Sequence, residues 1–82
     1  MSQKDKLVKR FLSIPSDFTY NETVTLMKFF GFIEKSNDGS RRAFYHPETS
    51  QVIFIHEPHP ESTMKKYALR DIKQSLEEGG YL

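Results

Sequence analysis

The sequence contains no cysteine, and this absence excludes several kinds of chemistry at once. Without thiols the chain can form no disulfide, no thiolate metal site and no covalent cysteine intermediate. A chain without cysteine suits a reducing compartment, so we expect a cytoplasmic protein. Residues 1–5 are polar and lack the apolar segment of a secretory signal peptide, so none is expected.

The sequence also lacks a large excess of positive or negative charge, and it has no long apolar run. The 82 residues include 12 Lys or Arg and 11 Asp or Glu, which gives a net charge of +1 and a pI of about 8.0. Nucleic-acid-binding domains often have a pI above about 9, so any such contact must come from local clusters of basic residues. No apolar run approaches the roughly 20 residues of a membrane helix, so no membrane contact is expected.

The length predicts one small domain over residues 1–82. A chain of this size buries only about 60% of its unfolded surface, which leaves no room for a deep cleft. No Gly-rich phosphate-binding loop is present either. Any chemistry is therefore expected at or near the surface.

Two helices are predicted in the first part of the chain. The first covers residues 4–13, where apolar residues recur at helical spacing, and Pro15 stops it. The second begins at a capping box, in which the side chains of Thr19 and Glu22 bond each other's backbone. Gly31 is placed to end this second helix.

Three strands and a last helix are predicted in the remainder. The strands cover residues 32–36, 41–46 and 51–56, separated by turn residues. Ser62 or Thr63 is expected to cap a helix that ends near Glu78. The order α-α-β-β-β-α predicts an α+β fold, with helices on one face of a three-stranded antiparallel sheet.

Strand alternation predicts which side chains lie on the uncovered face of this sheet, because successive residues point to opposite faces. If Phe44 belongs to the core, then Arg42 and His46 share its face, and Arg41 and Tyr45 lie on the open face. The third strand is largely apolar on both faces. Some aliphatic surface would then be exposed, which would suit a protein partner.

All three histidines lie between residues 46 and 59, two of them in the loop that reads His56-Glu57-Pro58-His59. Zinc requires three or four ligands, and no further ligands can be nominated, so no metal is expected. A different interpretation is acid–base catalysis of RNA cleavage, in which one group takes the 2′-OH proton and another protonates the leaving oxygen. An arginine would stabilise the charge on phosphorus. The plain alternative is that the histidines bond the backbone and only support the structure.

From Thr19 to Leu82 the chain resembles the HicA toxin family of bacterial and archaeal toxin–antitoxin systems. The segments that carry the resemblance are 29–32 (FFGF), 39–47 (GSRRAFYHP), 56–60 (HEPHP) and 64–69 (MKKYAL). The resemblance implies a double-stranded-RNA-binding-like fold and an mRNA-cleaving endoribonuclease that uses no metal or small-molecule cofactor. It also implies neutralisation by a HicB-like antitoxin, and it makes residues 1–18 an N-terminal helical extension.

One residue departs from the family pattern. Many family members have Gly-Ser-His at the start of the second strand, with the histidine as catalytic residue, whereas this chain has Arg41 there. Arginine stays protonated and cannot act as a base, so either the base has moved or activity is lost. Counted back from Leu69, His59 falls at the family's second histidine position, and we predict His59 and His56 as the proton-transfer residues. The predicted RNA contacts are Ser40, Arg41, Arg42, Lys65 and Lys66.

Three functions therefore remain open on the sequence. The first is an RNA-cleaving toxin bound by an antitoxin. The second is an RNA-binding module without catalysis, supported by the basic residues of the last helix. The third is a protein-interaction domain that uses the apolar sheet face.

Overall fold

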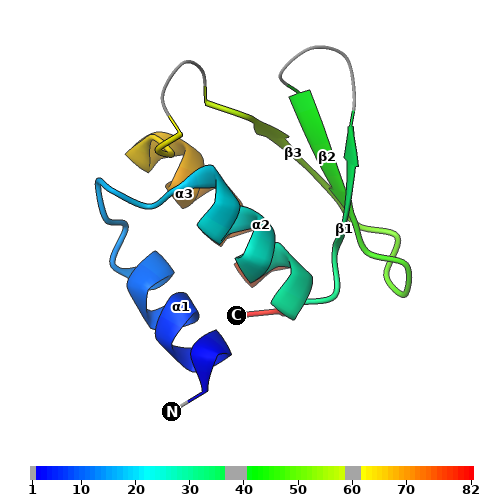
Figure 1. Ribbon diagram of the computed structural model, residues 1–82. Helices are drawn as coiled ribbons and strands as arrows, with labels where there is room; N and C mark the ends of the chain where they lie inside the picture. The colour runs from blue at the N-terminus through cyan, green and yellow to red at the C-terminus, as the bar shows by residue number, and fades with distance from the viewer. Residues whose placement is uncertain (1, 37–40, 59–61) are drawn as a thin grey trace.

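The computed structural model describes residues 2–36, 41–58 and 62–82. Its elements are α1 (Gln3–Leu12), α2 (Tyr20–Phe29), β1 (Ile33–Ser36), β2 (Arg41–Tyr45), β3 (Val52–His56) and α3 (Lys66–Glu78). The predicted order α-α-β-β-β-α and the α+β class are confirmed. Figure 1 shows the three helices gathered on one side of the sheet, with α3 behind α2 in this view. Within the described ranges, no helix is long and apolar enough to cross a bilayer.

The sheet is an antiparallel meander in the order β1-β2-β3. In β3, buried Ile53 and Ile55 alternate with exposed residues, and they pair in register with Phe44 and Arg42 of β2. This face meets the helices, and the hydrophobic core lies between them. The predicted assignment of the two faces, with Phe44 on the core side, is thus confirmed. The opposite face of the sheet is open to solvent.

The largest fully buried side chains come from every helix, from the central strand and from the segment that joins α1 to α2. They are Phe11, Phe18, Leu26, Met27, Phe44, Leu69 and Leu76. These side chains belong to one buried cluster, which packs the sheet against α2 and α3. Arg41 of β2 and His56 of β3 are held in place by this packing.

The predicted capping box at the start of α2 is present. The Glu22 amide donates to Thr19 Oγ1 over 3.1 Å, and the Thr19 amide donates to Glu22 Oε1 over 3.0 Å. The Glu22 carboxylate also accepts from Arg10 Nε over 2.9 Å, and Arg10 bonds Asp17 as well. This ion pair joins α1 to α2. The hydrogen bond from Arg10 is the main reason that the pKa of Glu22 lies below its usual range.

The Arg10–Glu22 pair predicts a pH-dependent contribution to stability. A carboxyl group with a lowered pKa in the folded state stabilises the fold above its unfolded pKa, and that contribution is lost as the pH falls through the folded value. At about pH 7 we expect Glu22→Gln to melt a few degrees below the parent protein. The difference should shrink steadily below about pH 4. Glutamine can still close a capping box, so thermal melts of the two proteins across pH isolate the ion pair. A difference that does not change with pH would contradict this origin.

The predicted cap of the last helix is wrong. Thr63 forms an isolated antiparallel bridge with Thr19, and the Met64 amide donates to the Phe18 carbonyl over 2.7 Å. This pairing holds residues 62–64 extended, so α3 begins only at Lys66. Lys65 takes the N-cap position, and its side chain makes no capping hydrogen bond.

Candidate functional site

His46 is a structural residue at the end of β2. It is only 7% exposed, and its Nε2 lies 3.0 Å from the Phe30 carbonyl oxygen. Its Nδ1 accepts from the Glu48 amide over 3.2 Å, so the proton belongs on Nε2, which donates to Phe30. Both ring nitrogens are therefore engaged with backbone. His46 therefore supports the structure by bonding the backbone, as the alternative to catalysis predicted for the histidines.

His56 has a different environment. It is the last residue of β3, it is exposed, and it lies on the open face of the sheet. Among the described residues its ring has no hydrogen-bond partner. In the strand register it stands directly opposite Arg41 of β2. Opposite residues have Cβ atoms about 4.5–5.5 Å apart, so an imidazole and a guanidinium can here reach one ligand.

Arg41 and Arg42 point to opposite faces. Arg41 is exposed on the open face, with its guanidinium 5.6 Å from the centre of the Phe54 ring. Arg42 lies on the helix side, where its Nη2 is 2.7 Å from Glu57 Oε1 and its Nη1 donates to the Arg41 carbonyl over 3.0 Å. The structure thus brings Arg41 to His56, and it directs Arg42 to the loop that follows β3. The two predicted phosphate contacts do not form one pair.

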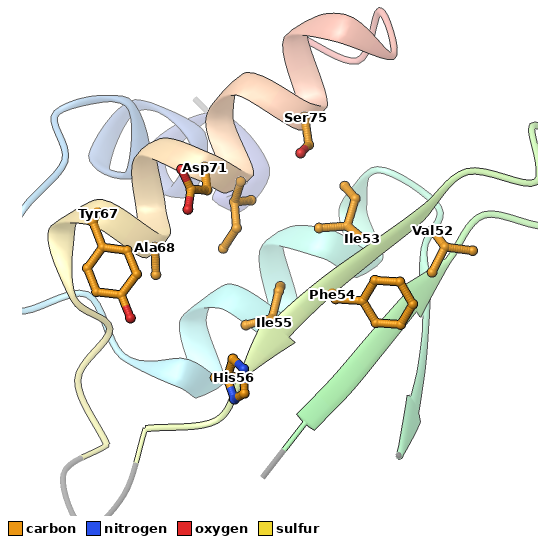
Figure 2. Close-up of a pocket in the computed structure, with 10 residues that line it drawn as sticks. Val52, Ile53, Phe54, Ile55, His56, Tyr67, Ala68, Asp71 and Ser75 are labelled. Atoms are coloured by element: carbon orange, nitrogen blue, oxygen red, sulfur yellow. The ribbon is translucent and has the colours of Figure 1, made fainter. Parts of the chain in front are cut away.

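A groove between β3 and α3 opens beside His56. Its main pocket has a volume of about 210 Å³, and a second pocket of about 190 Å³ continues past His56 to Lys65. Figure 2 shows the walls of the main pocket, with Ile55 of β3 facing Ala68 of α3. The main pocket is lined largely by apolar side chains of β3 and α3, and its polar groups are His56 at the end of β3 and Tyr67, Asp71 and Ser75 of α3. A groove of this size is large enough for one base or one short side chain.

Tyr67 is a residue of this groove that the sequence analysis missed. It lies in the first turn of α3, is 62% exposed and lines both pockets together with His56. In Figure 2 its hydroxyl end is on the side of the groove where His56 lies. Nothing in the helical pattern marks this residue, because it lies off the apolar stripe. Only the tertiary neighbourhood of His56 identifies it.

One comparison with known proteins decides the family. The family model described as HicA toxin of bacterial toxin-antitoxin matches residues 20–79, from the first residue of α2 to the residue after α3. The chain belongs to the HicA toxin family. The HicA resemblance drawn from the sequence is thereby confirmed, and α1 lies outside the matched region. No curated protein and no solved structure matches the chain.

As a HicA-family member, the protein is part of a toxin–antitoxin system, and an antitoxin is the kind of partner that the family implies. The site residues predicted from the sequence are only partly brought together. His56 and Lys65 line the same end of the groove, Arg41 stands opposite His56 on the open face of the sheet, and Lys66 is the first residue of α3. Ser40 and His59 lie outside the described residues. Across residues 2–36, 41–58 and 62–82, no group of three His, Asp or Glu residues is placed to hold a metal ion.

The first turn of α3 adds positive potential to this end of the HicA-family fold. Its backbone N–H groups carry the positive end of the helix dipole, and Lys65 and Lys66 stand beside them. Two cations at this position are unfavourable for an isolated helix. They become favourable when an anion binds beside them at the start of the helix.

Proposed function

We propose that this protein is the toxin of a type II toxin–antitoxin system that binds and cleaves mRNA in the cytoplasm and is neutralised by a HicB-like antitoxin. The observation that carries the proposal is the exposed His56 directly opposite Arg41, in a chain that matches the HicA toxin over residues 20–79. We further propose that residues 1–82 act as one domain. In it, residues 1–18 are an extension outside the catalytic region.

The proposed reaction is transesterification of the RNA backbone. His56 takes the proton of the 2′-OH, and the 2′-oxygen attacks phosphorus. The bond from phosphorus to the 5′-oxygen breaks, and His59 gives that oxygen a proton. The products are a 2′,3′-cyclic phosphate and a 5′-OH. Arg41, which stays charged throughout, stabilises the additional negative charge on the phosphoryl oxygens.

The lysines at the start of α3 are proposed to position the RNA. Lys65 lines the smaller pocket beside His56, so a phosphate adjacent to the scissile one can lie between them. Lys66 would extend this contact along the backbone. Such contacts hold the strand in register and carry no sequence information.

A second candidate function is RNA binding without cleavage. The observation that favours it is Arg41, because this residue stands where many family members have the catalytic histidine and it cannot accept a proton. In this alternative, Arg41 and the lysines still bind phosphate. His56 would then be a contact residue and no more.

Expression of the chain alone in a bacterial host tests the first candidate. We expect growth arrest with decay of transcripts, because a toxin without its antitoxin has unrestrained access to mRNA. The doubly substituted His56→Ala, His59→Ala protein, expressed to the same level and shown to fold, should permit growth. Co-expression of the HicB-like antitoxin should also restore growth. Normal growth and intact RNA with well-expressed, folded parent protein would instead support the second candidate.

A further inference from the structure

We propose that the open face of the sheet binds single-stranded RNA, with unpaired bases stacked on Phe54 and Tyr45. This inference rests on the proposed function and specifies the form of RNA that the protein takes. The face is made by the outward-pointing residues of all three strands. They are Ile33 and Lys35 of β1, then Arg41, Ala43 and Tyr45 of β2, then Val52, Phe54 and His56 of β3.

Aromatic exposure is the first observation that supports this role. Phe54 is 60% exposed in the middle of an edge strand, where a phenylalanine that only supports the fold would be covered. Figure 2 shows Phe54 and Val52 on the side of β3 away from α3, while Ile53 and Ile55 point toward that helix. Tyr45 lies on the same open face, on the central strand. The face thus presents one largely exposed ring, Phe54, and one partly exposed ring, Tyr45.

Charge is the second observation. Among the described residues of the open face, the charged side chains are Lys35 and Arg41, and none is acidic. The nearby carboxylates are turned away from it. Glu34 accepts from the Tyr20 hydroxyl on the helix side, and Glu57 pairs with Arg42. A face that combines rings with cations and excludes carboxylates is complementary to bases joined by phosphates.

The arrangement of rings and cations is the third observation. The Arg41 guanidinium lies 5.6 Å from the Phe54 ring centre, and Lys35 Nζ lies 5.1 Å from the Tyr45 ring centre. Each ring therefore has one cation over it, in a cation–π contact. A nucleotide can stack its base on the ring and place its phosphate on the cation, and two such units would accept two nucleotides.

The geometry favours single strands over duplexes. Bases in a duplex are already stacked and hidden, so proteins recognise duplex RNA through its backbone and 2′-hydroxyl groups. The exposed rings of the sheet cannot stack on the bases of a duplex, because those bases are not accessible. A single strand that crosses Phe54 also reaches Arg41 and His56, which lie at the end of the same face. The proposed surface therefore leads the substrate to the proposed catalytic residues.

A tryptophan placed at Phe54 tests the inference directly, because the sequence contains no tryptophan. The ligand is a single-stranded 2′-O-methyl RNA oligonucleotide, which has no free 2′-OH and cannot be cleaved. We expect it to quench the fluorescence of Phe54→Trp, and a duplex of the same sequence to do so far less. The matched control is Phe29→Trp, the same change at a residue of α2 that is 37% exposed, and its fluorescence should not change. Phe54→Ala should weaken binding about tenfold or more.

The outcomes separate this inference from the proposed function. Quenching by the single strand, in a protein that does not cleave ordinary RNA, would uphold the surface and reject the toxin's chemistry. RNA cleavage with oligonucleotide binding that leaves Phe54→Trp unquenched would reject the surface. Equal quenching by the duplex would reject single-strand selection. Quenching by the purified antitoxin, with no oligonucleotide bound, would make this face a protein interface and overturn the inference.

Discussion

Replacing His56 with alanine is expected to lower the rate of RNA cleavage by about 10²–10⁴-fold, the usual contribution of a positioned general base. The expectation follows from its exposure at the end of β3 and from its position opposite Arg41. Arg41→Ala should lower the rate by about 10²–10³-fold, because it removes one donor to the transition-state charge. Single-turnover cleavage of a labelled oligonucleotide by purified protein measures both effects.

Gln74→Ala is the matched control for these two variants. Gln74 is exposed on α3, and its amide bonds only Glu78 one turn further along the same helix. The cleavage rate of Gln74→Ala should equal that of the parent protein. Thermal melts of all three variants separate loss of chemistry from loss of fold. A folded His56→Ala protein that keeps more than about a tenth of the parent rate would contradict a base at this position.

A rescue experiment makes the same prediction sharper. Arg41→His restores the Gly-Ser-His sequence of many family members, and it puts an imidazole opposite position 56 in the strand register. In the inactive His56→Ala protein, Arg41→His should recover part of the cleavage rate, because the two positions face one ligand. It should recover nothing if the fold has lost the remainder of the active site. The second outcome would favour RNA binding without cleavage.

Most of the fold could be predicted because its signals are local. The Thr19–Glu22 capping box needs only residues three apart, and both of its hydrogen bonds are present. The two-residue period of β2 depends on backbone geometry alone. The burial of Phe44 therefore placed Arg41 on the open face correctly.

The start of α3 could not be predicted for the opposite reason. Ser62 and Thr63 have the side chains of helix caps, yet Thr63 pairs with Thr19 and the Met64 amide bonds Phe18. These partners are more than 40 residues away in the sequence. Backbone hydrogen bonds to a distant segment thus outweighed the local preference for a cap, and no window of sequence contains that information.

The candidate site was only partly predictable for the same reason. His46 and His56 look alike in sequence, since each ends a strand beside a turn. His46 is buried because the Phe30 carbonyl and the Tyr81 ring meet it from two other parts of the chain. His56 is exposed because nothing described covers that end of the sheet. Its pairing with Arg41 depends on the register of the β2–β3 hairpin, which strand propensity does not specify.

Gly31→Ala is expected to be the most destabilising single substitution considered, at about 2–4 kcal/mol. Gly31 has a φ of +92°, which an alanine adopts only with strain. A Cβ at this position would lie 2.8 Å from His46 Nε2, the atom that donates to the Phe30 carbonyl. The substitution therefore adds steric overlap and breaks a buried hydrogen bond. The melting temperature should fall by about 4–8 °C per kcal/mol in a chain of this size.

The loss of stability in Gly31→Ala should affect more than the turn at Gly31, because His46 contacts several parts of the fold. Its ring lies 5.1 Å from the ring centres of both Phe32 and Tyr81, and Tyr81 bonds Thr49 through its hydroxyl group. The cluster joins the end of α2 to the β2–β3 hairpin and to the residues after α3. A displaced His46 would loosen all three, and with them the register that sets His56 opposite Arg41.

Gly80→Ala separates the two causes of the loss. Gly80 also has a positive φ, +81°, but a Cβ there would have no neighbour within 4 Å. It should therefore cost only the backbone strain, about 1–2 kcal/mol. Denaturant unfolding of Gly31→Ala in parent and His46→Ala backgrounds measures the remainder, because the overlap with the ring cannot occur once the ring is removed. If Gly31→Ala cost no more than Gly80→Ala, or cost the same in both backgrounds, His46 would not be the residue that makes glycine necessary at position 31.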